Sequence, residues 1–274
     1  MTKPRTAEGY TEDQLERVRA TCLHLASVLG DLLDETAVVG GLVPSLLVGA
    51  REVERAHVGT TDLDLALELA LLETGRYQAL SARLRAGGFE PDKTAEGRVV
   101  RQRWRHHEAG ATIDFLMPPV TADARGGTLQ NLEADLAAVV TPGLRLAFRD
   151  RELVPLEGRT LQGERLTRTV PVCGPGAFVI LKALAFRDRG ENKDAYDLFY
   201  VLRHCGASVE NLAARTRTLL DDTEAPRAIG YLEDDFAEID STGPVRAAGF
   251  LGVVDDEAFR ADVVGLVARY LRAL

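Results

Sequence analysis

The hydrophobic and polar positions change along the chain from a mixed helix-and-strand pattern to a purely helical one. Apolar residues recur every three or four positions from Leu15 to Leu32, which predicts an amphipathic helix over residues 11–35 with Thr11 as its N-cap. Short apolar strands and helices follow, so that the order with this first helix included is αβαβαββ. After a short strand, Gly40, Gly41 and a helix starting at Pro44, the expected elements are a strand at 60–69, a helix at 73–88, and strands at 98–107 and 111–119.

The pattern is weaker after Pro119 and becomes helical from Gly174 onward. Residues 122–143 read as part loop and part helix, and residues 144–158 and 168–174 as short strands. Every later segment has helical periodicity. We therefore expect an α+β fold with a mixed sheet and flanking helices over residues 1–173, followed by a helical domain over residues 174–274.

Two aspartates interrupt the strand expected at 60–69. Successive side chains of a strand point to opposite faces, so Asp62 and Asp64 share one face and the neighbouring leucines share the other. Asp114, between Ile113 and Phe115, repeats this arrangement on another strand. Carboxylates held this close repel unless a cation lies between them, and Mg²⁺ prefers oxygen ligands. The alternative is that Asp62 and Asp64 are simply the solvent face of an edge strand.

A glycine turn precedes the acidic strand. Gly40 and Gly41 lie between the first strand and the short helix, where backbone N–H groups and the helix start can approach a phosphate. Ser45 would add a hydroxyl group. Taken alone, two glycines at this place are typical of an ordinary turn.

Together these motifs resemble the nucleotidyltransferase superfamily typified by DNA polymerase beta. The Thr-Thr-Asp-Leu-Asp run at 60–64 is similar to that of its AbiEii/AbiGii toxin-like branch. The segment LKALAFRDRGENKDAYDLFYVL, residues 181–202, resembles the C-terminal motif of the same branch. Its motif positions hold Lys182, Asp188, Arg189, Lys193, Asp194 and Asp197. Without the first motif, this segment reads as a solvated charged loop between two helices.

The resemblance implies a reaction and a role for each motif. The protein would transfer a nucleoside monophosphate from an NTP to a hydroxyl group, with Mg²⁺ or Mn²⁺ held by Asp62, Asp64 and Asp114. Asp114 would complete the second metal site or accept the proton of the hydroxyl. The helical domain would complete the nucleotide cleft, and catalytic Lys182 would hold the β- or γ-phosphate. Asp194 would be a further catalytic residue, on the nucleotide side of the cleft. The other nucleotide-binding positions would be Gly40, Gly41, Ser45, Thr61, Lys193 and Asp197.

The implied acceptor is a tRNA or a protein, with a cognate antitoxin as partner. Two departures leave other functions open: about twenty residues separate Gly41 from Asp62, with a possible inserted loop at 50–59, and Gly41 stands where many relatives have Ser. The alternatives are a nucleotidyltransferase for small molecules such as antibiotics, a glycosyltransferase with an Asp-x-Asp metal site, and an inactive nucleotide-binding module.

A basic strand bears on the acceptor. Alternation places Arg101, Arg103 and Arg105 on one face of the strand at 98–107, where they would bind a tRNA backbone or an acidic protein, or merely balance the acidic remainder. His106 and His107 point in opposite directions and are expected at the surface.

Composition and charge limit the remaining possibilities. The formal net charge of −9 over 274 residues excludes a protein whose whole surface coats nucleic acid. Three scattered cysteines without CxxC spacing indicate neither a zinc site nor a disulfide framework. The polar N-terminus and the lack of an apolar run of about 18 residues favour a soluble cytoplasmic protein without a membrane partner.

Overall fold

The computed structural model describes residues 4–49, 56–68, 75–121 and 123–274. By their contacts these residues form two compact units. The sheet unit comprises residues 13–42 and the described part of 60–173, and the helical unit comprises residues 174–274 with the described parts of 1–12 and 43–59. The sequence predicts a single boundary, at Gly174. The structure differs from this prediction because two N-terminal segments belong to the same unit as the C-terminal helices. That the units act as separate domains stays a prediction.

The strands of the sheet unit form one mixed sheet, as expected from the sequence. Within the described residues the order is β3-β4-β5-β2-β1-β9-β8, and β7 pairs with β5 and β6. The pairs β2–β5, β1–β9 and β5–β7 are parallel and the others are antiparallel. The strands are β1 Thr36–Val39, β2 Leu63–Leu67, β3 Phe89–Lys93, β4 Val99–His106, β5 Thr112–Met117, β6 Leu129–Asn131, β7 Ala137–Val140, β8 Arg151–Arg159 and β9 Arg165–Cys173.

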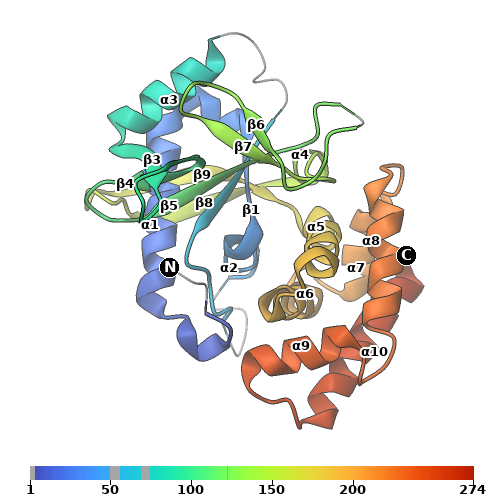
Figure 1. Cartoon of the computed structure of the whole chain (residues 1–274). Helices are drawn as coiled ribbons and strands as arrows, with labels where there is room; N and C mark the ends of the chain where they lie inside the picture. Colours follow the sequence, from blue (N-terminus) through green and yellow to red (C-terminus); the bar gives the residue numbers. More distant parts are fainter. Residues whose placement is uncertain (1–3, 50–55, 69–74, 122) are drawn as a thin grey trace. The chain divides into compact units, whose positions relative to one another are not determined.

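Two helices cover one face of this sheet, α1 (Glu12–Leu29) and α3 (Arg76–Ala86) (Figure 1). The ring of His24 in α1 lies 5.8 Å from that of Phe89, and Arg85 of α3 lies 5.1 Å from the ring of Trp104. Phe89, Trp104 and Phe115 are completely buried on this side. The alternating strands therefore place their apolar side chains under the helices and their charged side chains on the opposite face.

The helix predictions at the N-terminus are close to the structure. Helix α1 begins at Glu12, one residue after the predicted cap Thr11, and gives way at Gly30, whose φ is +56°, to a 3₁₀ helix over Gly30–Glu35. Residue 69 of the predicted strand, residues 73 and 74 of the predicted helix and residues 50–55 of the predicted inserted loop lie outside the described residues.

Several details of the sequence interpretation are wrong. The first part of the strand expected at 144–158 forms the short helix α4 (Leu146–Arg149), and strand β8 begins only at Arg151. The described part of 122–143 contains no helix and instead forms β6 and β7, because the short apolar run Ala137–Val140 pairs in parallel with β5. Pro142, two residues later, prevents further ladder pairing. His106 is also not at the surface: only 2% of it is exposed, because it packs edge-on against Phe89 and His24. His107 is exposed as expected, but it does not point away from His106 as predicted, because strand β4 ends at His106 and the two rings lie 5.1 Å apart.

The helical unit confirms the helical character of the chain after Gly174. Helix α5 starts with Pro175 at its first turn and stops at Gly190, whose φ is +63°. The core of the helical unit includes ring contacts between Phe186 and Phe236 and between Tyr196 and Phe250. The helices of this unit are η1 Ala7–Gly9, α2 Val43–Leu47, α5 Pro175–Arg189, α6 Asn192–His204, α7 Val209–Arg217, α8 Glu224–Asp235, α9 Thr242–Leu251 and α10 Glu257–Ala273. The short helices η3 (Gly40–Leu42) and α4 (Leu146–Arg149) belong to the sheet unit.

The expectations about membrane-spanning segments and about the cysteines can be compared with the described residues. Across the described ranges, no helix is both long and apolar enough to cross a bilayer. Cys22, Cys173 and Cys205 are all buried free thiols, and burial raises the pKa of Cys22 to about 12.

Candidate functional site

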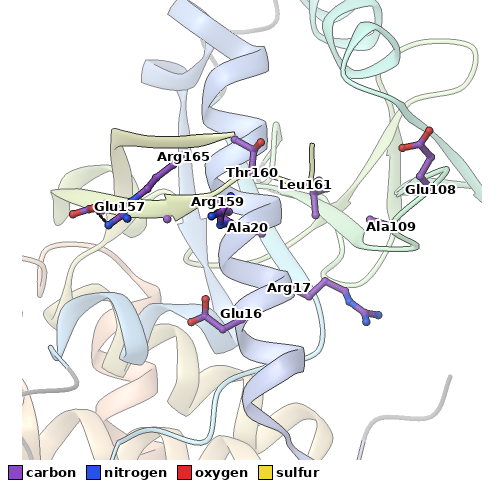
Figure 2. A pocket seen from close by; sticks show the side chains of 11 residues that line it. Glu16, Arg17, Ala20, Glu108, Ala109, Glu157, Arg159, Thr160, Leu161 and Arg165 are labelled. Atoms are coloured by element: carbon purple, nitrogen blue, oxygen red, sulfur yellow. Dashed lines mark hydrogen bonds and ion pairs between the residues drawn. The ribbon is translucent and has the colours of Figure 1, made fainter. Parts of the chain in front are cut away.

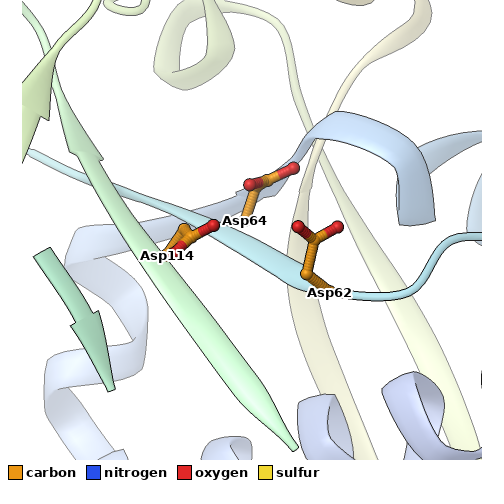
Figure 3. A group of neighbouring side chains, drawn as sticks. All are labelled: Asp62, Asp64 and Asp114. Carbon is orange, nitrogen blue, oxygen red and sulfur yellow. The ribbon is translucent and has the colours of Figure 1, made fainter. Parts of the chain in front are cut away.

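Three aspartates converge on the face of the sheet opposite α1 and α3. Strands β2 and β5 are parallel neighbours in a register that places Asp64 beside Asp114, and Asp62 directly precedes β2. Oxygen atoms of Asp62, Asp64 and Asp114 all lie within 4.8 Å of one another. Figure 3 shows the three carboxylates directed toward one another from the two strands. The alternation read from the sequence therefore produces the expected cluster.

The acidic cluster has a hydroxyl partner that the sequence interpretation missed. Thr60 Oγ1 donates a hydrogen bond to Asp62 Oδ1 over 3.1 Å, and both residues are buried. Both threonines belong to the motif, and the sequence interpretation assigns only Thr61 to the nucleotide site. Thr61 is half-buried beside them, and its role stays a prediction.

Arg103 is the second partner that the sequence interpretation did not assign to the cluster. It lies opposite Asp114 in the β4–β5 register, and its Nε and Nη2 donate to the two oxygens of that carboxylate, with 2.6 Å between Nε and Oδ1. Nη2 also lies 4.0 Å from Asp62 Oδ2. The hydrogen bonds from Arg103 to Asp114 raise the pKa of Arg103 above its usual value, although burial opposes this.

The basic strand is thus partly neutralised within the sheet. Arg105 makes a similar fork to Asp92, at 2.7 and 2.9 Å, and also donates to the carbonyl of Gly110. Of the three arginines predicted on one face, Arg101 alone makes no hydrogen bond or ion pair with the part of the chain that the structure describes. Two of the three are therefore occupied by carboxylates of their own sheet.

The glycine turn lies against the acidic strand. Gly40 follows β1, and its φ of +71° is in the left-handed region that favours glycine. A Cβ atom at Gly40 would lie 2.0 Å from Asp64 Oδ2, so the carboxylate occupies the space that any other side chain would need. Gly41 is buried beside it, and Ser45 lies on α2 in the helical unit. Their contacts with phosphate stay predictions.

The residues of the second motif gather in a buried charged cluster of the helical unit. Lys182 Nζ on α5 donates to Asp194 and Asp197 on α6 over 2.8 and 2.7 Å, which confirms that these aspartates share a helix face. Lys193 and Arg189 complete the cluster, at 2.7 Å from Asp197 and 2.6 Å from Asp194. Asp188 is exposed and lies outside it. The nucleotide contacts expected of these residues stay predictions.

Charge pairing outweighs burial for Lys182 and Asp197, whereas burial lowers the pKa of Lys193 below its usual value although Asp197 opposes this. Burial alone would lower the pKa of Lys182, but Asp194 and Asp197 outweigh it and raise that pKa above its usual value. Burial would raise the pKa of Asp197, yet Lys182 and Lys193 hold it below its usual range. Lys182 and Asp197 are therefore charged near neutral pH.

His57 joins this cluster from a segment far away in the sequence. Its Nδ1 accepts a hydrogen bond from the Gly59 N–H, so its Nε2 is the nitrogen that donates to Asp197 Oδ1 over 2.9 Å. Its ring stacks on Tyr196 and meets Tyr200 edge-on. Burial lowers the pKa of His57 to about 4, against the opposing effect of Asp197. A lone histidine carries no sequence signal for such a contact, and the sequence interpretation did not identify it.

An open hollow of about 960 Å³ lies elsewhere on the sheet unit (Figure 2). None of the predicted site residues lines it. Its charged side chains include both signs in equal number, so no class of ligand is indicated. Its lining residues are Glu16, Arg17, Ala20, Glu108, Ala109, Glu157, Gly158, Arg159, Thr160, Leu161 and Arg165.

Comparison with known proteins agrees with the motifs. No curated protein sequence is significantly similar to the chain. A family model described as nucleotidyl transferase AbiEii toxin, type IV TA system, matches residues 28–273. This range includes the glycine turn, the three aspartates and the buried charged cluster, and it confirms the resemblance found in the sequence. The chain belongs to the AbiEii family of nucleotidyl transferase toxins of type IV toxin–antitoxin systems.

Proposed function

We propose that this protein transfers a nucleoside monophosphate from an NTP to a hydroxyl acceptor and acts as the toxin of a toxin–antitoxin pair. The observation that carries the proposal is the convergence of Asp62, Asp64 and Asp114 beside the Gly40 turn. Membership of a nucleotidyl transferase family supports the same reaction class.

The three carboxylates fit a hard divalent cation. They offer only oxygen atoms, these lie within 4.8 Å of one another, and such donors suit Mg²⁺ or Mn²⁺ better than zinc. Asp62 and Asp64 would hold the cation, with Asp114 completing the site. When bound, a divalent cation in such a site neutralises phosphate charge and favours the ionised form of an attacking hydroxyl group.

The residues of the chain would orient the reactants for an in-line displacement. The acceptor oxygen bonds to the α-phosphorus, the bond from that phosphorus to the β-phosphate oxygen breaks, and pyrophosphate leaves. The hydroxyl proton passes to a nearby base, for which the Asp114 carboxylate is our candidate. Gly40, Gly41, Ser45 and Thr61 are proposed to contact the nucleotide.

The buried charged cluster is proposed to serve the nucleotide side of the reaction. Lys182 has two carboxylate partners, so a phosphate oxygen would have to replace or share one of them. Lys193, Asp194 and Asp197 would keep Lys182 in place during that exchange. A phosphate contact and a packing role for Lys182 are therefore compatible.

The acceptor is proposed to be a hydroxyl group of tRNA or protein in the cytoplasm, where NTPs are abundant. Arg101 remains available for an acidic acceptor, since Arg103 and Arg105 are bound to carboxylates of the sheet. A cognate antitoxin that prevents this reaction would be the partner.

The test is transfer of label from α-³²P-labelled NTPs in the presence of Mg²⁺. Bulk tRNA, protein extract and aminoglycosides are offered as separate acceptors, and a UDP-sugar labelled in the sugar is offered in parallel. We expect label on tRNA or protein that disappears in Asp62→Asn and Asp64→Asn. Asp92→Asn is the matched control, because it changes an aspartate of the same sheet that is paired with Arg105 instead.

Other outcomes would replace the proposal. Label on aminoglycosides alone would indicate a small-molecule enzyme, and transfer from the UDP-sugar would indicate a glycosyltransferase. No transfer of label under any of these conditions would indicate an inactive relative.

A further inference from the structure

Arg103 faces the acidic cluster in a way that bears on cation binding. Its guanidinium group engages both oxygens of Asp114 and lies 4.0 Å from Asp62. Bidentate forks between arginine and carboxylate are strong and directional. A carboxylate held in this way has fewer free lone pairs in the direction of a second cation.

The charges of the cluster also indicate that Arg103 opposes the binding of a cation. Three carboxylates converge here, and Arg103 lies among them, in contact with Asp114 and 4.0 Å from Asp62. A guanidinium group within a few ångströms repels a divalent cation that enters the same cluster. Arg103 therefore opposes cation binding both by its charge and by occupying Asp114.

The neighbouring fork shows what is specific to Arg103. Arg105 lies two residues along the same strand and pairs with Asp92 by the same two nitrogen atoms. That pair joins β4 to β3, whereas Arg103 and Asp114 join β4 to β5, the strand that contributes Asp114 to the acidic cluster. Two chemically equal forks thus stand on one strand, and only one of them uses a carboxylate of the cluster.

We propose that Arg103 is a built-in competitor for the divalent cation, which sets the affinity of the cluster by holding Asp114 until the cation is bound. The inference rests on the proposed function, because it takes the three aspartates to be the cation site. It makes Arg103 a positioning residue that acts through Asp114. Cation binding loosens the fork, and loss of the guanidinium charge strengthens cation binding.

The test measures Mn²⁺ binding by electron paramagnetic resonance, without nucleotide, on the full chain. Arg103→Gln removes the charge, and we expect it to bind Mn²⁺ about tenfold more tightly than the unchanged protein, the order expected for removing a unit charge about 5 Å from a divalent ion in a watery site. Arg105→Gln is the matched control and should bind Mn²⁺ as the unchanged protein does.

A double-mutant comparison tests whether Asp114 mediates the effect. In an Asp114→Asn background the fork is already weakened, so Arg103→Gln should improve Mn²⁺ binding by a smaller factor than in the unchanged protein. An equal factor in both backgrounds would overturn the role of Asp114.

A second measurement uses the unchanged protein and therefore does not depend on whether a variant folds. In the unchanged protein, saturating Mg²⁺ should shift the ¹⁵N resonance of the Arg103 side-chain Nε and leave that of Arg105 in place. If the Arg103 resonance does not move while Mg²⁺ binds, the competition does not occur.

The outcomes separate this inference from the proposed function. Mn²⁺ binding by the unchanged protein with no gain in Arg103→Gln, or with a loss, overturns the inference alone. No Mn²⁺ binding by either protein overturns both. Binding only after Arg103→Gln would be the strongest form of the competition.

Discussion

At the scale of single residues, Gly40 links the glycine turn to the acidic strand. Its conformation and the closeness of Asp64 are separate reasons for glycine at this position. The sequence suggests only the first kind of reason, since two glycines between a strand and a helix indicate a turn. The second depends on β1 lying next to β2, with Val39 opposite Asp64.

Replacing Gly40 with alanine should therefore displace Asp64. We expect Gly40→Ala to lower the free energy of unfolding by more than the roughly 1–2 kcal/mol typical of a left-handed non-glycine residue, and to weaken Mn²⁺ binding. Denaturant titration and Mn²⁺ binding measure the two effects. Gly97→Ala is the control, because Gly97 has a φ of +79° but nothing within 4 Å of its added Cβ. Equal effects of both changes on Mn²⁺ binding would contradict the role of the contact.

At the scale of secondary-structure elements, alternation and helical spacing predicted most of the site. They correctly place Asp62, Asp64 and Asp114 on one sheet face, and Asp194 and Asp197 on one helix face. What they miss are contacts that depend on register or on distant segments. Arg103 meets Asp114 only because β4 pairs with β5 in one register, and His57 reaches Asp197 across a sequence separation of 140 residues.

The buried cluster between α5 and α6 should contribute to stability. Lys182→Met removes a cation that two buried aspartates share, and we expect a loss of about 3–5 kcal/mol in the free energy of unfolding. Chemical denaturation monitored by circular dichroism measures it. Arg269→Met, which breaks an exposed pair with Glu210 in the same unit, should have little effect. A Lys182→Met protein as stable as this control would show that the cluster is dispensable.

The burial of His57 should make stability depend on pH. The pKa of His57 is lowered to about 4 in the folded protein, so the unfolded chain takes up a proton first as the pH falls. The contribution of His57 to the free energy of unfolding is therefore fully present above its unfolded pKa of about 6.5. It is lost progressively as the pH falls toward 4. Between pH 6.5 and 5 we expect the free energy of unfolding to fall by roughly 2 kcal/mol from this residue.

His57→Gln tests the assignment, because the amide can still donate to Asp197 but does not titrate. Denaturation at pH 5 and pH 7 should show a smaller pH effect than in the unchanged protein. Some dependence should remain, since burial also lowers the pKa of His106 and of His204. His107→Gln, at an exposed position, is the control. An unchanged pH effect in His57→Gln would assign it to other groups.

At the scale of the whole molecule, cation binding should stabilise the sheet unit. Trp104, the single tryptophan of the chain, is completely buried in this unit, so its fluorescence reports unfolding there. Mg²⁺ at about one hundred times its dissociation constant should add about 2.7 kcal/mol to the free energy of unfolding. Asp64→Asn should abolish the gain and Asp92→Asn should keep it. Stabilisation that survives Asp64→Asn would place the cation elsewhere.

The sequence was less informative about how the chain divides. The change of periodicity marks Gly174, where the helical unit resumes, but the described part of residues 43–59 also belongs to that unit. Their short helix α2 follows the glycine turn directly, and nothing in its apolar pattern distinguishes a helix that packs on a sheet from one that packs on other helices. Membership of a unit is decided by tertiary contacts, which local patterns do not encode.

The pairing of Asp64 with Asp114 across β2 and β5 also has a kinetic consequence. These strands are distant in the sequence, so the complete set of carboxylates forms only after a long loop has closed in the correct register. A cation that needs all three carboxylates has little to bind in the early stages of folding. Mg²⁺ should therefore act mainly by slowing the unfolding of the finished sheet, with little effect on the rate at which it forms.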